Sequence, residues 1–212
     1  MLKLVERDYR VFREVERWRF CLSRHIQFLA GFSSQRTCDR RLRLLIAEDF
    51  LIRHMVLYGV PSVYMLTRKT KTMIFANQRK IHFRLDQIIH DITVLDLAIC
   101  FMKQFELSPD DIKTDKQLHQ DDGFGVRTHH PDFVFTKDKK TYCVEVELSL
   151  KSKERLERNI KSNFLNYNVQ IWVTDKNSVK LIRTLKDLKT QYPNIELTNI
   201  KEVQNELFRF NN

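Results

Sequence analysis

The sequence predicts a two-domain protein of mixed α+β and α/β class. An N-terminal domain (residues 1–70) precedes an α/β domain with a central mixed sheet (residues 71–212). Apolar residues at helical spacing dominate the first 50 residues, and two short strand-like runs follow them. After residue 80, a long helical pattern leads into strands and helices that alternate, which is typical of α/β folds. With 42% hydrophobic and 30% charged side chains among 212 residues, the chain has enough apolar material for such cores.

Composition excludes several classes of protein. No stretch has the roughly 20 apolar residues that a membrane span needs, and no apolar run follows the first charges as it would in a signal peptide. The four cysteines lie far apart and form no Cys-x-x-Cys pair. We therefore expect reduced thiols in an intracellular protein, without a zinc ribbon or a disulfide framework.

The net charge of +10 is confined to the N-terminal part of the chain. Residues 1–80 carry 17 basic and 7 acidic side chains, whereas residues 81–212 carry 20 of each. Such confinement is typical of a protein that binds a polyanion, most often nucleic acid. A basic surface kept for solubility is the alternative, and it does not explain why the charge is confined.

Three helices are expected before residue 50. Residues 3–18 should form the first, a short second helix should be capped by Ser23 and ended by Gly31, and a third should follow. The apolar face of the first helix consists of Val5, Tyr9, Phe12 and Val15.

The third helix, capped by Ser33 or Ser34, has two opposite faces. Its apolar face consists of Cys38, Leu42 and Leu45, and its basic face consists of Arg36, Arg40 and Arg43. Two helices joined at a glycine, with basic side chains facing away from the core, match the helix-turn-helix pattern. We expect these three arginines and the neighbouring Arg41 to contact double-stranded DNA, mainly through phosphates. The alternative is a three-helix bundle whose arginines face water.

Two β-type runs, Phe50–Val56 and Ser62–Thr67, follow with a turn that contains Gly59 and Pro61. They predict a β-wing, and so the first domain is expected to be a winged helix-turn-helix. Residues 68–81 should form a polar connector.

The second domain should open with a helix whose apolar residues step by 3 and 4: Leu85, Ile88, Ile92, Leu95, Ile99 and Met102. The apolar face of this helix could be buried against a sheet, or it could form the contact between two copies in a homodimer. The segment 108–125 should be loop-rich, with a strand near residues 112–118. Residues 132–135 and 141–148 should pair as a hairpin around a turn at residues 137–140.

Carboxylates gather on this hairpin. Glu145 and Glu147 should lie on one face of the second strand, about 7 Å apart, and Asp132 begins the partner strand. Neighbouring carboxylates repel unless a cation lies between them, and oxygen ligands suit Mg²⁺ or Mn²⁺. Lys151 could reach the same point, which would equip the site for phosphodiester hydrolysis. The alternative is an acidic strand edge that faces solvent.

The remaining chain predicts a helix over residues 151–163 with Leu156, Ile160 and Phe164 inward, a strand at 169–173 and a helix at 177–189. A strand at 195–197 and a short helix should close the domain.

Pro131-Asp132 followed by Glu145-x-Glu147 resembles the PD-(D/E)xK core of restriction-type nucleases, with Glu147 at the usual lysine position. With His129 and Lys151 added, the pattern is similar to the motif of the MOB-C class of plasmid relaxases. The related replication-relaxation group also joins an N-terminal winged helix to such a core, so the resemblance covers nearly the whole chain.

The resemblance implies a restriction-endonuclease-like domain in a bacterial cytoplasmic protein that nicks one DNA strand at a plasmid transfer origin. Asp132, Glu145 and Glu147 would hold Mg²⁺ or Mn²⁺, Lys151 would assist, and His129 would orient a water or touch the phosphate. Accessory relaxosome proteins or a coupling protein would be the further partners.

Two other functions fit the sequence. One is a DNA-binding accessory or replication-control protein whose nuclease-like domain is inactive, and the other is an endonuclease that cuts both strands. Tyr142 and Tyr167 are both candidate covalent nucleophiles, although Tyr142 should point away from the carboxylates. At least one of His129 and His130 should have no role, and His119 shows no ligand spacing.

Overall fold

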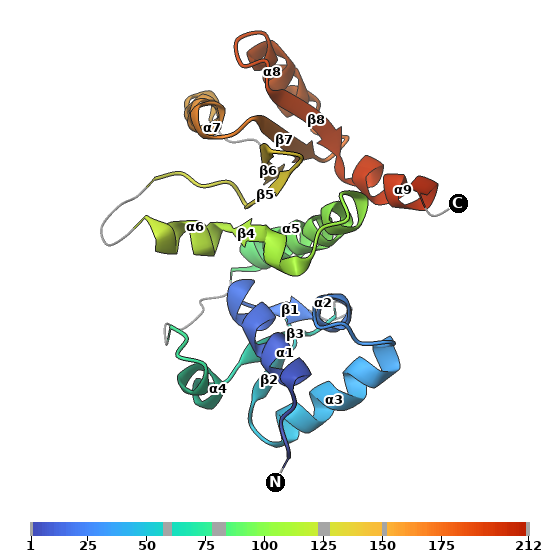
Figure 1. Ribbon diagram of the computed structural model, residues 1–212. Coiled ribbons are helices and arrows are strands. Elements are labelled where there is room, and N and C mark those ends of the chain that lie inside the picture. Colours follow the sequence, from blue (N-terminus) through green and yellow to red (C-terminus); the bar gives the residue numbers. More distant parts are fainter. Residues whose placement is uncertain (1, 57–60, 78–83, 123–127, 150–151, 211–212) are drawn as a thin grey trace. The chain divides into compact units, whose positions relative to one another are not determined.

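The computed structural model describes residues 2–56, 61–77, 84–122, 128–149 and 152–210. It shows a mixed α+β protein, in which a helical region with a small sheet is followed by a five-stranded mixed sheet with interspersed helices (Figure 1). The chain divides into two compact units, Met1–Leu95 and Asp96–Asn212. No helix in the described part of the chain is long and apolar enough to cross a membrane.

The first unit combines helices with a three-stranded antiparallel sheet of order β1-β3-β2. Its elements are α1 (Glu6–Arg17), β1 (Cys21–Leu22), α2 (Ser23–Leu29), α3 (Gln35–Ala47), β2 (Leu51–His54), β3 (Val63–Leu66) and α4 (Arg68–Met73). The helix α5 (Leu85–Gln104) begins in this unit and ends in the second.

The three predicted N-terminal helices are confirmed, with two differences. Phe12 and Val15 of α1 are fully buried, but Tyr9 is exposed, and so is Val5, which precedes α1 as its N-cap residue. Ser23 is the first residue of α2 and not its cap, which is Leu22. Gly31 ends α2 as predicted, with a φ of 68° that glycine adopts without strain.

The predicted cap of α3 and the predicted strand pair are also confirmed. The Ser34 hydroxyl accepts a hydrogen bond from the Thr37 backbone N–H at 3.2 Å. The strands β2 and β3 pair antiparallel with Leu51 opposite Leu66. Of the predicted turn, Gly59 lies outside the described residues.

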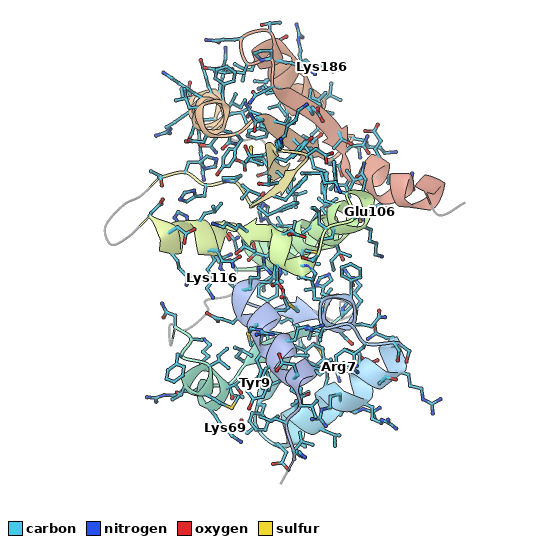
Figure 2. The ribbon with its side chains drawn as sticks, in the orientation of Figure 1. Arg7, Tyr9, Lys69, Glu106, Lys116 and Lys186 are labelled. Atoms are coloured by element: carbon cyan, nitrogen blue, oxygen red, sulfur yellow. The ribbon has the colours of Figure 1, made fainter. Side chains whose placement is uncertain are left out.

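The predicted connector after residue 67 was wrong in part, because its first residues form α4. Thr67 caps this helix by accepting a hydrogen bond from the Thr70 backbone N–H at 3.2 Å. Lys69, labelled in Figure 2, ties this helix to the segment between α3 and β2. Its Nζ lies 4.0 Å from the centre of the Phe50 ring and donates a hydrogen bond to the Glu48 carbonyl at 2.7 Å.

The second unit is built around a sheet of order β4-β5-β6-β7-β8, antiparallel from β4 to β6 and parallel from β6 to β8. Its strands are β4 (Ile112–Thr114), β5 (Phe133–Lys137), β6 (Lys140–Glu147), β7 (Val169–Thr174) and β8 (Ile195–Asn199). Its helices are the 3-10 turn η1 (Pro109–Asp111), α6 (Asp115–Asp121), α7 (Lys153–Asn166), α8 (Val179–Lys189) and α9 (Ile200–Phe210).

The predicted hairpin turn is confirmed. Asp138 and Lys139, between β5 and β6, both have positive φ (49° and 63°). Two central residues with positive φ make the turn whose twist matches a tight hairpin. It sets the register that places Phe133 opposite Val144.

Each face of this sheet is covered by helices (Figure 1). On one face, Phe101 and Phe105 of α5 pack against Phe133, Phe135 and Tyr142. On the other face, α7 and α8 enclose the fully buried Trp172 of β7, which forms a cluster with Leu156, Ile160, Leu181 and Leu185. Because β6 is the middle strand of a covered sheet, both of its faces are withdrawn from water.

Three further expectations need correction. Leu85, the first residue of α5, is 48% exposed, and Phe164, which meets the ring of the buried Tyr192 edge to face, is still 39% exposed. The predicted strand at 112–118 ends at Thr114, whose hydroxyl and backbone N–H form a capping box with Gln117 that starts α6.

Candidate functional site

The basic face of α3 is exposed as predicted. The side chains of Arg36, Arg40 and Arg43 face solvent, whereas Cys38 and Leu42 on the opposite face are fully buried. A helix with this division can lay its basic face on a polyanion without disturbing its own packing.

A pocket of about 500 Å³ lies next to this face, between α3 and the β2–β3 pair. Arg43 from α3, Arg24 from α2 and Arg53 from β2 all line it. Sequence analysis missed Arg24 and Arg53. The second could have been found from the strand pattern, because on β2 only Leu51 is buried and the residues after it face outward.

Arg41 differs from the other arginines of α3. Its Nε donates to Oδ1 of Asp8 at 2.8 Å and its Nη2 to Oδ2 at 2.5 Å, while Nη2 also donates to the Lys3 carbonyl. The Asp8 side chain is fully buried, and the hydrogen bonding of Arg41 to this carboxylate raises the pKa of Arg41. This bidentate pair ties α3 to α1, so we assign Arg41 to the fold and not to the basic face.

Glu145 and Glu147 lie on β6 in the middle of the second sheet. Only 4% and 3% of their surfaces are exposed, which excludes the alternative of an acidic edge that faces solvent. The parallel register places Glu145 opposite Trp172 and Glu147 opposite Thr174. Both carboxylates therefore lie on the sheet face covered by α7, at the carboxyl end of the parallel strands.

Glu145 has two close partners. Its Oε1 accepts a hydrogen bond from Nδ2 of Asn163 on α7 at 2.9 Å and lies 2.6 Å from Nε2 of His129. A carboxylate taken out of water needs hydrogen-bond partners of this kind in place of the water that it loses. Asn163 is itself buried, and its other polar atom, Oδ1, makes no hydrogen bond to the residues that the structure describes.

Asp132 precedes β5 and lies beside this pair. Its Oδ2 accepts a hydrogen bond from the backbone N–H of Val146, the residue between the two glutamates, at 2.7 Å. Phe133 pairs with Val144, so the antiparallel register places the preceding residue, Asp132, opposite Glu145. Residues opposite one another lie on the same face of the sheet. The fourth predicted residue, Lys151, lies outside the described residues.

The three predicted carboxylates share a face but do not gather around one point. Among the described residues, the one group of three whose ligand atoms lie within 4.8 Å of one another is His119, Asp122 and His130. The candidate ligand atoms of Asp132, Glu145 and Glu147 are carboxylate oxygens, which suit Mg²⁺ or Mn²⁺. Mg²⁺ usually keeps several waters and binds one or two carboxylates, so a full ring of protein ligands is not required.

Sequence analysis missed Asn163, because a polar residue in an amphipathic helix is ordinarily assigned to the face that meets solvent. Its spacing from the buried Leu156 and Ile160, seven and three residues earlier, was the available signal. Of the two candidate tyrosines, Tyr142 stacks on Phe135 at 4.9 Å on the opposite face of the sheet, as predicted.

Tyr167 lies near the carboxylates, and its environment keeps it protonated. Burial raises the pKa of Tyr167 to about 12, with further contributions from Cys143, Glu145 and Asp122. A neutral phenol is a weak nucleophile. Tyr167 is therefore suited to donate a hydrogen bond near Glu145 at neutral pH.

We expect this phenol to make stability depend on pH above 10. A pKa raised on folding stabilises the protein below its unfolded value, near 10, and this contribution is lost as the pH rises toward 12. Tyr167→Phe should therefore lose less stability than the wild type between pH 10 and pH 12. Urea unfolding at several pH values measures this difference, and parallel losses in the two proteins would contradict it.

The chain was compared with protein-family models, with curated proteins and with solved structures, and none of the three comparisons found a match.

Proposed function

We propose that this protein is a metal-dependent phosphodiesterase that nicks one strand of double-stranded DNA, a relaxase acting at a plasmid transfer origin in the bacterial cytoplasm. The observation that carries the proposal is the burial of Glu145 and Glu147 on one face of the central strand β6. Glutamate side chains are seldom buried this deeply, and two of them on one face of a strand form an oxygen-rich group that a hard cation such as Mg²⁺ can bind.

Electrostatics supports a cation at this position. Glu145 and Glu147 are two residues apart on a strand, which separates them by about 7 Å, and burial strengthens their repulsion. A bound Mg²⁺ or Mn²⁺ held by these glutamates and Asp132 would offset it. Such an ion polarises a scissile phosphate and lowers the pKa of a bound water.

The neighbours of Glu145 have defined roles in this proposal. His129 and Asn163 both contact Oε1 of Glu145, so they orient this carboxylate and leave Oε2 for the cation. His129 is thus a positioning residue for Glu145 and does not act on a water or on the phosphate. Lys151 keeps its proposed assisting role on the resemblance alone.

The first unit supports DNA as the substrate. Its helices and its sheet of order β1-β3-β2 support the proposal of a winged helix-turn-helix, in which α3 would be the recognition helix. The exposed Arg36, Arg40 and Arg43 would contact phosphates, with Arg24 and Arg53 beside them. A restriction-endonuclease-like second domain would then receive DNA held by the first.

One observation favours a second function, a DNA-binding accessory or replication-control protein without nuclease activity. In a closed metal site the ligand atoms lie close together. The carboxylate oxygens of Asp132, Glu145 and Glu147 do not all lie within 4.8 Å of one another. In that case the basic face of α3 would carry the function, and the second domain would serve for contacts with partner proteins.

Titration with Mn²⁺ by calorimetry separates these two functions. We expect the wild type to bind Mn²⁺ at this site, excess Mg²⁺ to displace it, and Glu145→Gln/Glu147→Gln to lose that binding while retaining the fold by circular dichroism. Glu196→Gln, an exposed glutamate on β8 of the same sheet, is the control. No Mg²⁺-displaceable binding in the wild type would refute the nuclease and favour the accessory protein.

A further inference from the structure

A second cluster of potential metal ligands lies outside the carboxylate site. His119 on α6 and Asp122, three residues later, lie on the same side of the helix end, and His130 comes from the segment that leads into β5. Nε2 of His130 lies 2.5 Å from Oδ2 of Asp122, and Nδ1 of His119 lies 3.8 Å from the same oxygen. The two imidazole rings meet edge to face with their centres 4.6 Å apart.

These separations suit a small transition-metal ion. Zinc bonds to histidine nitrogen and carboxylate oxygen are about 2.0–2.2 Å long, so tetrahedral ligands lie about 3.4 Å from one another. The two distances to Asp122 lie on either side of that value, and modest rotations of the side chains would equalise them. A metal ion would replace the hydrogen bond between Asp122 and His130.

The surroundings hold the carboxylate in place. The Thr128 hydroxyl donates a hydrogen bond to Oδ2 of Asp122 at 2.6 Å and lies 3.1 Å from Nε2 of His130. The hydrogen bond from this hydroxyl is the largest cause of the lowered pKa of Asp122, and the hydrogen bond with His130 is the next largest. A polar group that orients a ligand in this way is a regular feature of metal sites in proteins.

Access also fits. The side chain of His119 is 47% exposed, and those of Asp122 and His130 are 18% and 13% exposed. An ion can therefore reach the cluster from solvent, and one coordination position remains for water.

We propose that His119, Asp122 and His130 bind a zinc ion with a fourth position open to water. Two imidazoles and one carboxylate form a donor set suited to zinc and other borderline metals, not to Mg²⁺ or Ca²⁺. The ion joins the end of α6 to the segment before β5, which also contains His129. This site is separate from the carboxylate site, whose ligands are all oxygens.

Competition between the protein and a chromophoric chelator for Zn²⁺ tests the proposal. We expect one zinc per wild-type chain and a loss of affinity of at least about 100-fold in His119→Ala/His130→Ala. His54→Ala, which removes an exposed imidazole from β2, should bind zinc like the wild type. Glu145→Gln/Glu147→Gln should also retain zinc, so failure of the carboxylate site would leave this result unchanged.

Substitution with Co²⁺ provides a second measurement. The visible absorption of a four-coordinate Co²⁺ site should appear in the wild type and be absent from Asp122→Asn/His130→Ala, with circular dichroism reporting that the variant is folded. Absence of zinc binding in the wild type would overturn the proposal. Undiminished binding in a folded His119→Ala/His130→Ala variant would do the same, because the cluster would then be a hydrogen-bonded joint only.

Discussion

Glu147→Gln is expected to reduce Mn²⁺-dependent nicking of supercoiled plasmid by at least about 100-fold, because a bound metal supplies several kcal/mol of transition-state stabilisation. Glu147 is almost completely buried at the end of the central strand β6, so few other groups can replace its carboxylate. Conversion of supercoiled to open-circular plasmid on agarose gels measures the rate. A linear product from the wild type would instead identify an endonuclease that cuts both strands.

The matched control is Glu196→Gln, which removes the same charge from an exposed position on β8 and should leave nicking unchanged. Stability provides a check on the fold of Glu147→Gln. Without metal, this variant should unfold at a temperature no lower than the wild type, because a neutral amide relieves repulsion with Glu145. Undiminished nicking by a folded Glu147→Gln would remove this residue from the site.

Arg41→Ala is expected to reduce stability far more than Arg40→Ala, although the two arginines are adjacent on α3. Removing Arg41 leaves the fully buried Asp8 without its bidentate partner, which should cost about 3–5 kcal/mol of stability. Arg40 is exposed, so Arg40→Ala should change stability by no more than about 0.5 kcal/mol. Urea unfolding measures both changes.

DNA binding should show the reverse order. Fluorescence anisotropy with labelled duplex DNA at several salt concentrations should give a weaker affinity for Arg40→Ala and a salt dependence smaller by about one phosphate contact. Folded Arg41→Ala, measured below its unfolding transition, should bind like the wild type. Equal losses of DNA affinity in both variants would return Arg41 to the basic face, and no loss in Arg40→Ala would remove Arg40 from it.

Local patterns in the sequence were sufficient for most secondary structure and for part of the candidate site. The spacing of apolar residues predicted α3 and the division of its faces, and alternation along β6 placed Glu145 and Glu147 on one side. These predictions succeeded because helix and strand periods are properties of the chain itself. The prediction of a connector after Thr67 failed because the lysine contact that holds α4 against Phe50 crosses about twenty residues.

The sequence by itself therefore determined which residues share one face of a helix or strand. Only the tertiary structure decided which partner residues, or solvent, each face contacts. Glu145 is buried because β7 pairs with β6 and Asn163 of α7 lies above it. Arg41 differs from Arg40 only because Asp8, thirty-three residues earlier, lies beneath it. Partners that are distant in the chain leave no periodic trace, so burial and pairing become visible only when the elements are packed together.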